Sequence, residues 1–158
     1  MNNYLIIGNC GVGKTYVMRV LINAYKNNPA KLGTLYFHQI KHFLVLGKYV
    51  GDVFDGSDKL SMSVALEFPK LKALAKRDGL SIICEGDRFT NSTFINLFDP
   101  QILLIKGDGA EGRKQRGSTQ TARQIKSIET RVGNIKPHRT FENSQECLEY
   151  LMKKVIRE

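Results

Sequence analysis

Short apolar runs alternate with amphipathic stretches along the chain. The first apolar run covers 4–7, and further runs predict strands at 34–38, 81–84, 101–105 and 138–141, with room for one more short strand within 39–47. Helical patterns follow these runs at 16–26, 59–76, 91–97, 119–132 and 145–156. Strands that alternate with helices in this way predict an α/β fold built on a parallel sheet.

Proline, glycine and aspartate mark where these elements end. Asn27-Asn28-Pro29 ends the first helical stretch, and Gly33 starts a turn. Pro69 predicts a break or a restart near the middle of the helix at 59–76. The segment 47–58 is rich in Gly and Asp, which predicts an exposed loop. Since no repeat, low-complexity tract or linker divides the sequence, we expect one domain over residues 1–158.

The composition restricts the class of protein. An apolar fraction of 42% in 158 residues is ordinary for a globular domain, and the sequence contains no apolar run of membrane-spanning length and no visible signal peptide. The three cysteines, Cys10, Cys84 and Cys147, lie far apart and form no C-x-x-C pair. We therefore expect a reduced, cytoplasmic protein without a zinc site and without a membrane partner.

The net charge of +9 bears on the choice of partner. Basic charge attracts polyanions, of which nucleic acid is the commonest. Four cations toward the C-terminus are candidates for contacts with a nucleic-acid backbone, namely Lys126, Arg131, Lys136 and Arg139. A solvated basic surface is the alternative, because small enzymes that bind phosphates are often basic.

The strongest motif is GNCGVGKT at residues 8–15, which matches the phosphate-binding P-loop pattern G-x-x-x-x-G-K-[ST] between a strand and a helix. Glycines let successive N–H groups point at phosphate oxygens, and the positive end of the following helix faces the same anion. Lys14 supplies a charge for the outer phosphates, and the Thr15 hydroxyl is a candidate Mg²⁺ ligand. A glycine-rich turn without a ligand is the alternative. The residues expected to hold the nucleotide are Asn9, Cys10, Gly11, Val12, Gly13, Lys14, Thr15 and Tyr16.

A second polar group, Glu85-Gly86-Asp87-Arg88, follows the buried run at 81–84. Because the carboxyl ends of parallel strands share one edge of a sheet, we expect this group near the P-loop. Glu85 and Asp87 are candidates for binding a metal, directly or through water, or for deprotonating an acceptor. The alternative for Glu85 is a cap on the next loop. Arg88 either clamps a substrate phosphate or pairs with Asp58.

A basic segment follows the strand at 101–105. Residues 107–117 are rich in glycine and carry three cations, Arg113, Lys114 and Arg116. Cations above the phosphates would screen developing charge and exclude water. A solvated basic loop is the alternative.

The loop at 47–58 is the acidic counterpart of this segment. It contains Asp52, Asp55 and Asp58, one of which is a candidate general base on the acceptor side. Turn formation is the alternative for each of them. Together with the P-loop, Glu85–Arg88 and the basic segment, this loop brings four polar clusters to one predicted edge, which favours an enzyme.

The order of these clusters resembles the nucleotide kinase group of P-loop proteins over essentially the whole chain. Gly11 inside the loop is typical of the kinase version of the motif. The resemblance implies a three-layer P-loop kinase fold with a five-stranded parallel sheet and a basic lid over about 107–131. It also implies ATP and Mg²⁺ as cofactors, phosphorylation of a hydroxyl or a phosphate, and a lid role for Arg113, Lys114 and Arg116.

A narrower resemblance rests on the segments at 46–61, 85–89 and 116–121. They resemble phage-type small kinases, among them the 5-hydroxymethyluracil DNA kinases of DNA hypermodification pathways, which phosphorylate a base hydroxymethyl group inside DNA. This implies a phage-encoded protein in a bacterial host, with a modified base in DNA as the acceptor. The catalytic candidates are Lys14, Asp58, Glu85, Asp87, Arg88, Arg113 and Arg116, and the metal candidates are Thr15 and Glu85.

Three functions remain open from the sequence. A DNA kinase explains the P-loop, the segment resemblance and the excess charge. A kinase for free nucleosides or nucleoside monophosphates explains the P-loop and the lid but not the charge. A nucleotide-dependent binding protein or ATPase without an acceptor belongs to another class, and the Asp-rich loop argues against it. The oligomeric state stays undetermined.

Overall fold

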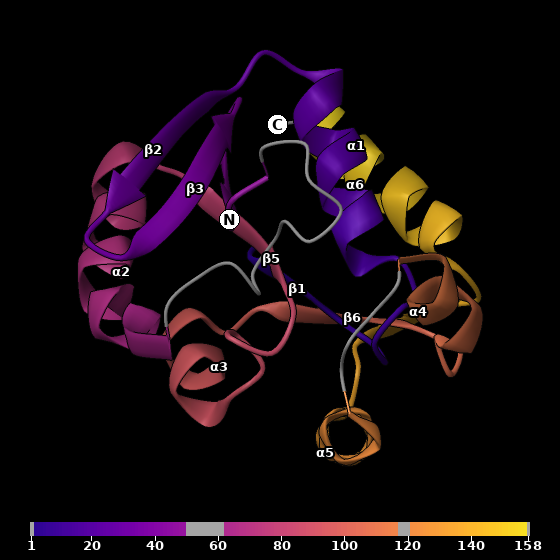
Figure 1. Cartoon of the computed structure of the whole chain (residues 1–158). Helices are drawn as coiled ribbons and strands as arrows, with labels where there is room; N and C mark the ends of the chain where they lie inside the picture. Colours follow the sequence, from indigo (N-terminus) through magenta and orange to yellow (C-terminus); the bar gives the residue numbers. More distant parts are fainter. Residues whose placement is uncertain (1, 50–61, 117–120, 158) are drawn as a thin grey trace.

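The computed structural model describes residues 2–49, 62–116 and 121–157 (Figure 1). Within them the fold is α/β, with a mixed seven-stranded sheet in the order β2-β3-β4-β5-β1-β6-β7. The strands are β1 (Tyr4–Ile7), β2 (Asn28–Leu32), β3 (Leu35–Ile40), β4 (Phe43–Leu46), β5 (Ser81–Glu85), β6 (Gln101–Ile105) and β7 (Arg139–Phe141). The helices are α1 (Lys14–Ala24), the 3₁₀ helix η2 (Met62–Glu67), α2 (Phe68–Asp78), α3 (Ser92–Phe98), α4 (Ala110–Arg116), α5 (Ala122–Gly133) and α6 (Ser144–Arg157).

The sheet is larger than the five-stranded parallel sheet that the resemblance implies. The strands β4, β5, β1, β6 and β7 do run parallel, but the antiparallel hairpin β2–β3 extends the sheet beyond β4. Residues 27–33 were expected to end a helix and begin a turn. Pro29 is compatible with β2 because that strand lies at the edge of the sheet, and Gly33, with φ 60°, allows the tight turn into β3.

Two helical layers cover the two faces of this sheet. In the central strand β1, Tyr4 and Ile6 pack against the layer of α1 and α6, whereas Leu5 and Ile7 pack against the layer of α2 and α3. Figure 1 shows α1 beside α6 and, across the sheet, α2 near α3. A strand that is buried on both faces reads as a continuous apolar run, which is why the run at 4–7 predicts β1 correctly.

The helices match the sequence pattern with one exception. Pro69 stands at the start of α2, directly after η2, so the predicted restart is confirmed. The segment 107–117 was expected as a basic loop, but it contains α4. The expected polar helix near 119–132 is present as α5, which has no buried residue. None of the helices in the described ranges combines the length and the apolar character needed to cross a lipid bilayer.

Candidate phosphate-binding site

The glycine-rich loop, residues 8–15, connects β1 to α1 as the motif predicts. Gly11 has a φ of 92° and Gly13 a φ of 102°, values that favour glycine over residues with a side chain. Gly13 is the N-cap of α1 and no side chain caps this end. The first turn of α1 therefore receives no hydrogen bond from the side chain of its N-cap residue, an arrangement that is suited to an anion.

Lys14 folds back over this loop. Its Nζ donates to the carbonyl oxygen of Gly8 at 2.7 Å and to that of Asn9 at 3.0 Å. These bonds hold a positive charge at the loop, next to the first turn of α1. If a phosphate bound there, the Lys14 ammonium group would replace part of its hydrogen bonding to these carbonyl oxygens by a charge-assisted hydrogen bond to a phosphate oxygen.

The start of α4 packs directly on the glycine-rich loop. A Cβ at Gly109 would collide with the carbonyl oxygen of Cys10, and a Cβ at Gly112 would collide with that of Gly11. Only glycine at these two positions allows such a close approach of the two backbones. The segment that the sequence analysis assigned to a lid is therefore in contact with the loop.

Arg113 reinforces the same contact. Its Nη1 donates to the carbonyl oxygens of Cys10 at 2.8 Å and Asp108 at 2.6 Å, and Asn9 Nδ2 donates to the carbonyl oxygen of Gly107 at 2.8 Å. The guanidinium thus lies against the loop that is expected to hold phosphates. Whether it also contacts a phosphate stays a prediction.

Glu85 ends a buried hydrogen-bonded chain. It is 3% exposed at the end of β5, and its Oε1 accepts a hydrogen bond from the Tyr49 hydroxyl at 3.0 Å. The Tyr49 backbone N–H donates to His38 Nε2 at 3.2 Å, so the proton of a neutral His38 is on Nδ1, which lies 3.1 Å from Asn27 Oδ1. Three buried or half-buried side chains therefore fix the position of this carboxylate.

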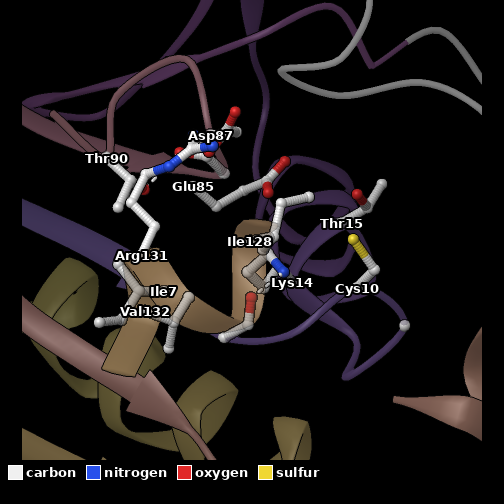
Figure 2. A pocket seen from close by; sticks show the side chains of 13 residues that line it. Ile7, Cys10, Lys14, Thr15, Glu85, Asp87, Thr90, Ile128, Arg131 and Val132 are labelled. Atoms are coloured by element: carbon white, nitrogen blue, oxygen red, sulfur yellow. Dashed lines mark hydrogen bonds and ion pairs between the residues drawn. The ribbon is translucent and has the colours of Figure 1, made fainter. Parts of the chain in front are cut away.

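The glycine-rich loop, the end of β5 and α5 enclose one cavity (Figure 2). The enclosed space is about 40 Å³, enough for one or two water molecules. Lys14 and Thr15 line it from the start of α1 and Glu85 from the end of β5, while Ile128 and Val132 of α5 form an apolar wall. This space is too small for a nucleobase while α5 stays in this position.

Asp87 and Arg131 close the same cavity with an ion pair, which Figure 2 shows. Arg131 is a candidate for contacts with a nucleic-acid backbone, and in this structure its guanidinium pairs with Asp87; the nucleic-acid contact stays a prediction. Asp87 therefore lines the cavity as predicted, with its charge balanced from α5. Arg88 follows on the same turn, half-buried, and does not line the cavity.

Several predicted residues cannot be compared with this geometry. Asp52, Asp55 and Asp58 lie outside the described residues, and so does the side chain of Arg116 at the end of α4. Tyr49 and Arg131 line or support the site although the motifs did not indicate them. For Tyr49 a signal existed, since it follows the apolar run at 43–46 by three residues at the expected edge of the sheet.

The three cysteines differ in their surroundings. Cys10 is 8% exposed and lines the cavity, whereas Cys84 and Cys147 are completely buried. Burial raises the pKa of the Cys84 thiol well above its usual range, and the negative charge of Glu85 adds to this. Burial also raises the pKa of Cys147 to about 12. Neither buried thiol can ionise readily at neutral pH, so neither is suited to chemistry.

The described residues contain no cluster of three or more His, Cys, Asp or Glu side chains placed to hold a metal ion. Thr15 and Glu85 still fit Mg²⁺, because this ion keeps several waters and takes one or two protein oxygens plus phosphates. No family model matches the chain, and comparisons with curated proteins and with solved structures found no significant match. Function must therefore be inferred from the residues of the site.

Proposed function

We propose that this protein is an ATP-dependent phosphotransferase, a kinase that moves the γ-phosphoryl group to a hydroxyl acceptor. One observation carries the proposal: the cradle of residues 8–15, the Lys14 ammonium, the Thr15 hydroxyl and the buried Glu85 carboxylate all border one cavity. Phosphoryl transfer is mainly positioning and charge neutralisation, and these groups supply both.

A hollow beside the loop is suited to the nucleoside part of ATP. Tyr16, Gln115 and Ser144 line it together with Gly11 and Gly13. Tyr16 is 49% exposed, which leaves its ring available to stack on a base. A nucleoside in this hollow would lead its phosphates into the cradle at the start of α1.

Each side chain of the site has a definite task in this proposal. When bound, Mg²⁺ with ATP supplies the phosphoryl group and part of the countercharge. Lys14 neutralises the outer phosphate oxygens, and the backbone N–H groups of the loop orient them. Thr15 and Glu85 offer hard oxygen ligands to the metal ion, with Glu85 held by Tyr49.

The acceptor is expected on the side of the cavity formed by Asp87, Ile128, Arg131 and Val132. The resemblance to 5-hydroxymethyluracil DNA kinases and the net charge of +9 favour a hydroxymethyl group on a base in DNA. A cavity this recessed requires the base to leave its stack before its hydroxyl can reach the phosphate. The apolar wall of α5 offers the flipped base a surface to pack on.

The alternative acceptor is a free nucleoside or nucleoside monophosphate, which is smaller than a nucleic acid and would require a smaller displacement of α5. The alternative of another class is an ATPase or a nucleotide-dependent binding protein. The ion pair between Asp87 and Arg131 is the observation that favours it, because it occupies the acceptor side in this structure.

Labelled ATP separates these possibilities. The protein is incubated with nucleosides, with nucleoside monophosphates, and with duplex DNA that contains 5-hydroxymethyluracil. Label in DNA alone supports the proposed acceptor, label in a free nucleoside or nucleotide supports the first alternative, and release of phosphate without a labelled acceptor supports the ATPase. Absence of all three activities would overturn the proposal.

A further inference from the structure

The net positive charge of this chain is concentrated in its N-terminal third, because acidic residues are absent there. Residues 1–51 contain six Lys and Arg and no Asp or Glu, and the first carboxylate is Asp52. Four of the six are lysines on or beside the hairpin β2–β3 and strand β4, namely Lys26, Lys31, Lys41 and Lys48. The hairpin β2–β3, which the resemblance to kinases does not imply, thus belongs to a basic region of the chain.

Three of these lysines stack on tyrosine rings. Lys31 Nζ lies 5.1 Å and Lys48 Nζ 4.9 Å from the ring centroid of Tyr36, and Lys41 Nζ lies 5.2 Å from that of Tyr25. Neither Lys31 nor Lys48 forms an ion pair with any described residue. Two like charges therefore gather around the Tyr36 ring, and neither forms an ion pair with a described carboxylate. The Glu67 carboxylate lies against Gly33, at the turn of the same hairpin, without pairing with either lysine.

The register of the strands brings this cluster to the edge of the sheet that carries the site. Val45 pairs with Ile83, so Gly47 is level with Glu85 across β4 and β5. The Gly47 N–H donates to the Tyr36 carbonyl oxygen at 2.8 Å, which makes Tyr36 level with both. Since neighbouring strands lie about 4.8 Å apart, Tyr36 is roughly 10 Å from the Glu85 backbone, and the partner strand with Lys31 roughly 15 Å.

This separation distinguishes a polymer from a mononucleotide. Each strand of DNA carries one phosphate per about 3.4 Å of helix axis, so 10–15 Å corresponds to roughly three or four nucleotide steps. Lys48, beside Gly47, lies only one strand spacing from Glu85, so the distance argument rests on the strand that carries Lys31. A mononucleotide held at Glu85 offers no phosphate at that strand, whereas a nucleic acid whose reacting base is in the cavity offers further phosphates at that distance.

We propose that Lys31, Tyr36 and Lys48 form a contact surface for the phosphate backbone of a nucleic acid bound at this edge of the sheet. The inference rests on the proposed function in one respect, which is that the bound nucleic acid is the acceptor. The Tyr36 ring fixes the two lysine stems, and their ammonium groups bind phosphates as point charges without reading the bases. Binding also removes the repulsion between the two charges, and it releases counterions from the DNA.

The test is direct binding of a fluorescein-labelled 20-base-pair DNA duplex, measured by anisotropy between 50 and 300 mM salt without nucleotide. The double variant Lys31→Gln, Lys48→Gln should reduce the slope of log affinity against log salt by about two, because each lost phosphate contact removes about 0.9. The variant Lys31→Arg, Lys48→Arg should keep the wild-type slope. Circular dichroism checks that each variant is folded.

Lys72 and Lys76 provide a control matched in charge. Both are exposed on α2, and they border a hollow with Asn3 and Leu80 at the opposite edge of the sheet, where β1 and β5 begin. Lys72→Gln, Lys76→Gln should leave the salt slope within about 0.5 of wild type. An equal loss of slope in both double variants would overturn the proposal, since total charge alone would then account for binding. Parallel slopes for wild type and Lys31→Gln, Lys48→Gln would also overturn it.

The same variants separate this surface from the proposed phosphotransfer. If the lysine pair sets the salt slope while no acceptor becomes labelled, the surface stands and the kinase proposal fails. If DNA becomes labelled and the pair has no effect on the slope, the kinase proposal stands and the surface fails. Wild-type protein that does not bind the duplex at 50 mM salt overturns the surface.

Discussion

Replacing Tyr49 with phenylalanine tests whether its hydrogen bond to Glu85 serves activity as well as stability. The change removes one hydroxyl and keeps the ring, which packs beside His38 at a centroid distance of 5.9 Å. Tyr49 is 7% exposed and Glu85 3%, so water cannot simply replace the lost donor. A hydrogen bond to a charged group contributes about 1.5–3 kcal/mol. For a chain of this length, losing it lowers Tm by about 3–12 °C.

A purely structural role of Tyr49 would end with this loss of stability. If Glu85 positions the metal ion, Tyr49→Phe should also lower kcat roughly tenfold and raise the Mg²⁺ concentration needed for half-maximal rate, with little change in KM for ATP. Steady-state rates in a Mg²⁺ titration, at a temperature well below Tm, measure both effects. The control is Tyr25→Phe, whose hydroxyl makes no hydrogen bond to a described residue. An unchanged Mg²⁺ dependence in Tyr49→Phe would refute the positioning role.

Three other substitutions or treatments examine the glycine-rich loop. Lys14→Ala should lower the rate of phosphoryl transfer by more than about tenfold with an unchanged circular dichroism spectrum, and a smaller loss would contradict the phosphate assignment. Arg113→Ala should lower kcat roughly tenfold to a thousandfold while KM for ATP changes less; the opposite pattern would make Arg113 a binding residue. At pH 8 a thiol reagent should modify Cys10 and leave Cys84 and Cys147 intact, because burial raises the pKa of the latter two thiols. ATP should slow the modification of Cys10, which lines the cavity. Mass spectrometry of the labelled peptides measures both the selectivity and the effect of ATP.

The parts of the fold that follow from local pattern are predictable from the sequence. The runs at 4–7 and 101–105 match β1 and β6 residue for residue, because strands buried on both faces leave an uninterrupted apolar signature. The strand β2 was missed since its residues are exposed, and Asn28-Pro29 resembles the end of a helix. Its pairing depends on β3, and a contact between strands leaves little trace in the composition of either one.

The residues of the site also fall into those that the sequence predicts and those that it does not. The loop at 8–15 is predictable because its chemistry lies within eight consecutive residues, and Glu85 is predictable because it ends a strand. Arg131 lines the same cavity from α5, and Tyr49, three residues beyond β4, donates a hydrogen bond to Glu85. Their roles therefore depend on packing between elements far apart in the chain. The pattern of a single sequence correctly predicts that α5 is a helix, but it does not predict which surface of the protein this helix packs against.

The docking of α5 bears on which acceptor the cavity can take. The helix has no buried residue, although its Ile128 and Val132 form the apolar wall of the cavity. Its ion pair from Arg131 to Asp87 is partly exposed, so displacing the helix breaks a weakly stabilising contact. A helix held so loosely can yield to a large acceptor, whereas a cavity of about 40 Å³ with a rigid wall could not. An anionic acceptor would also compete with Asp87 for the Arg131 guanidinium, which would free Asp87 to accept a proton from the acceptor hydroxyl. The ion pair on the proposed acceptor side is therefore compatible with the proposed nucleic-acid substrate, because the phosphates of such a substrate would provide the charge needed to break the pair.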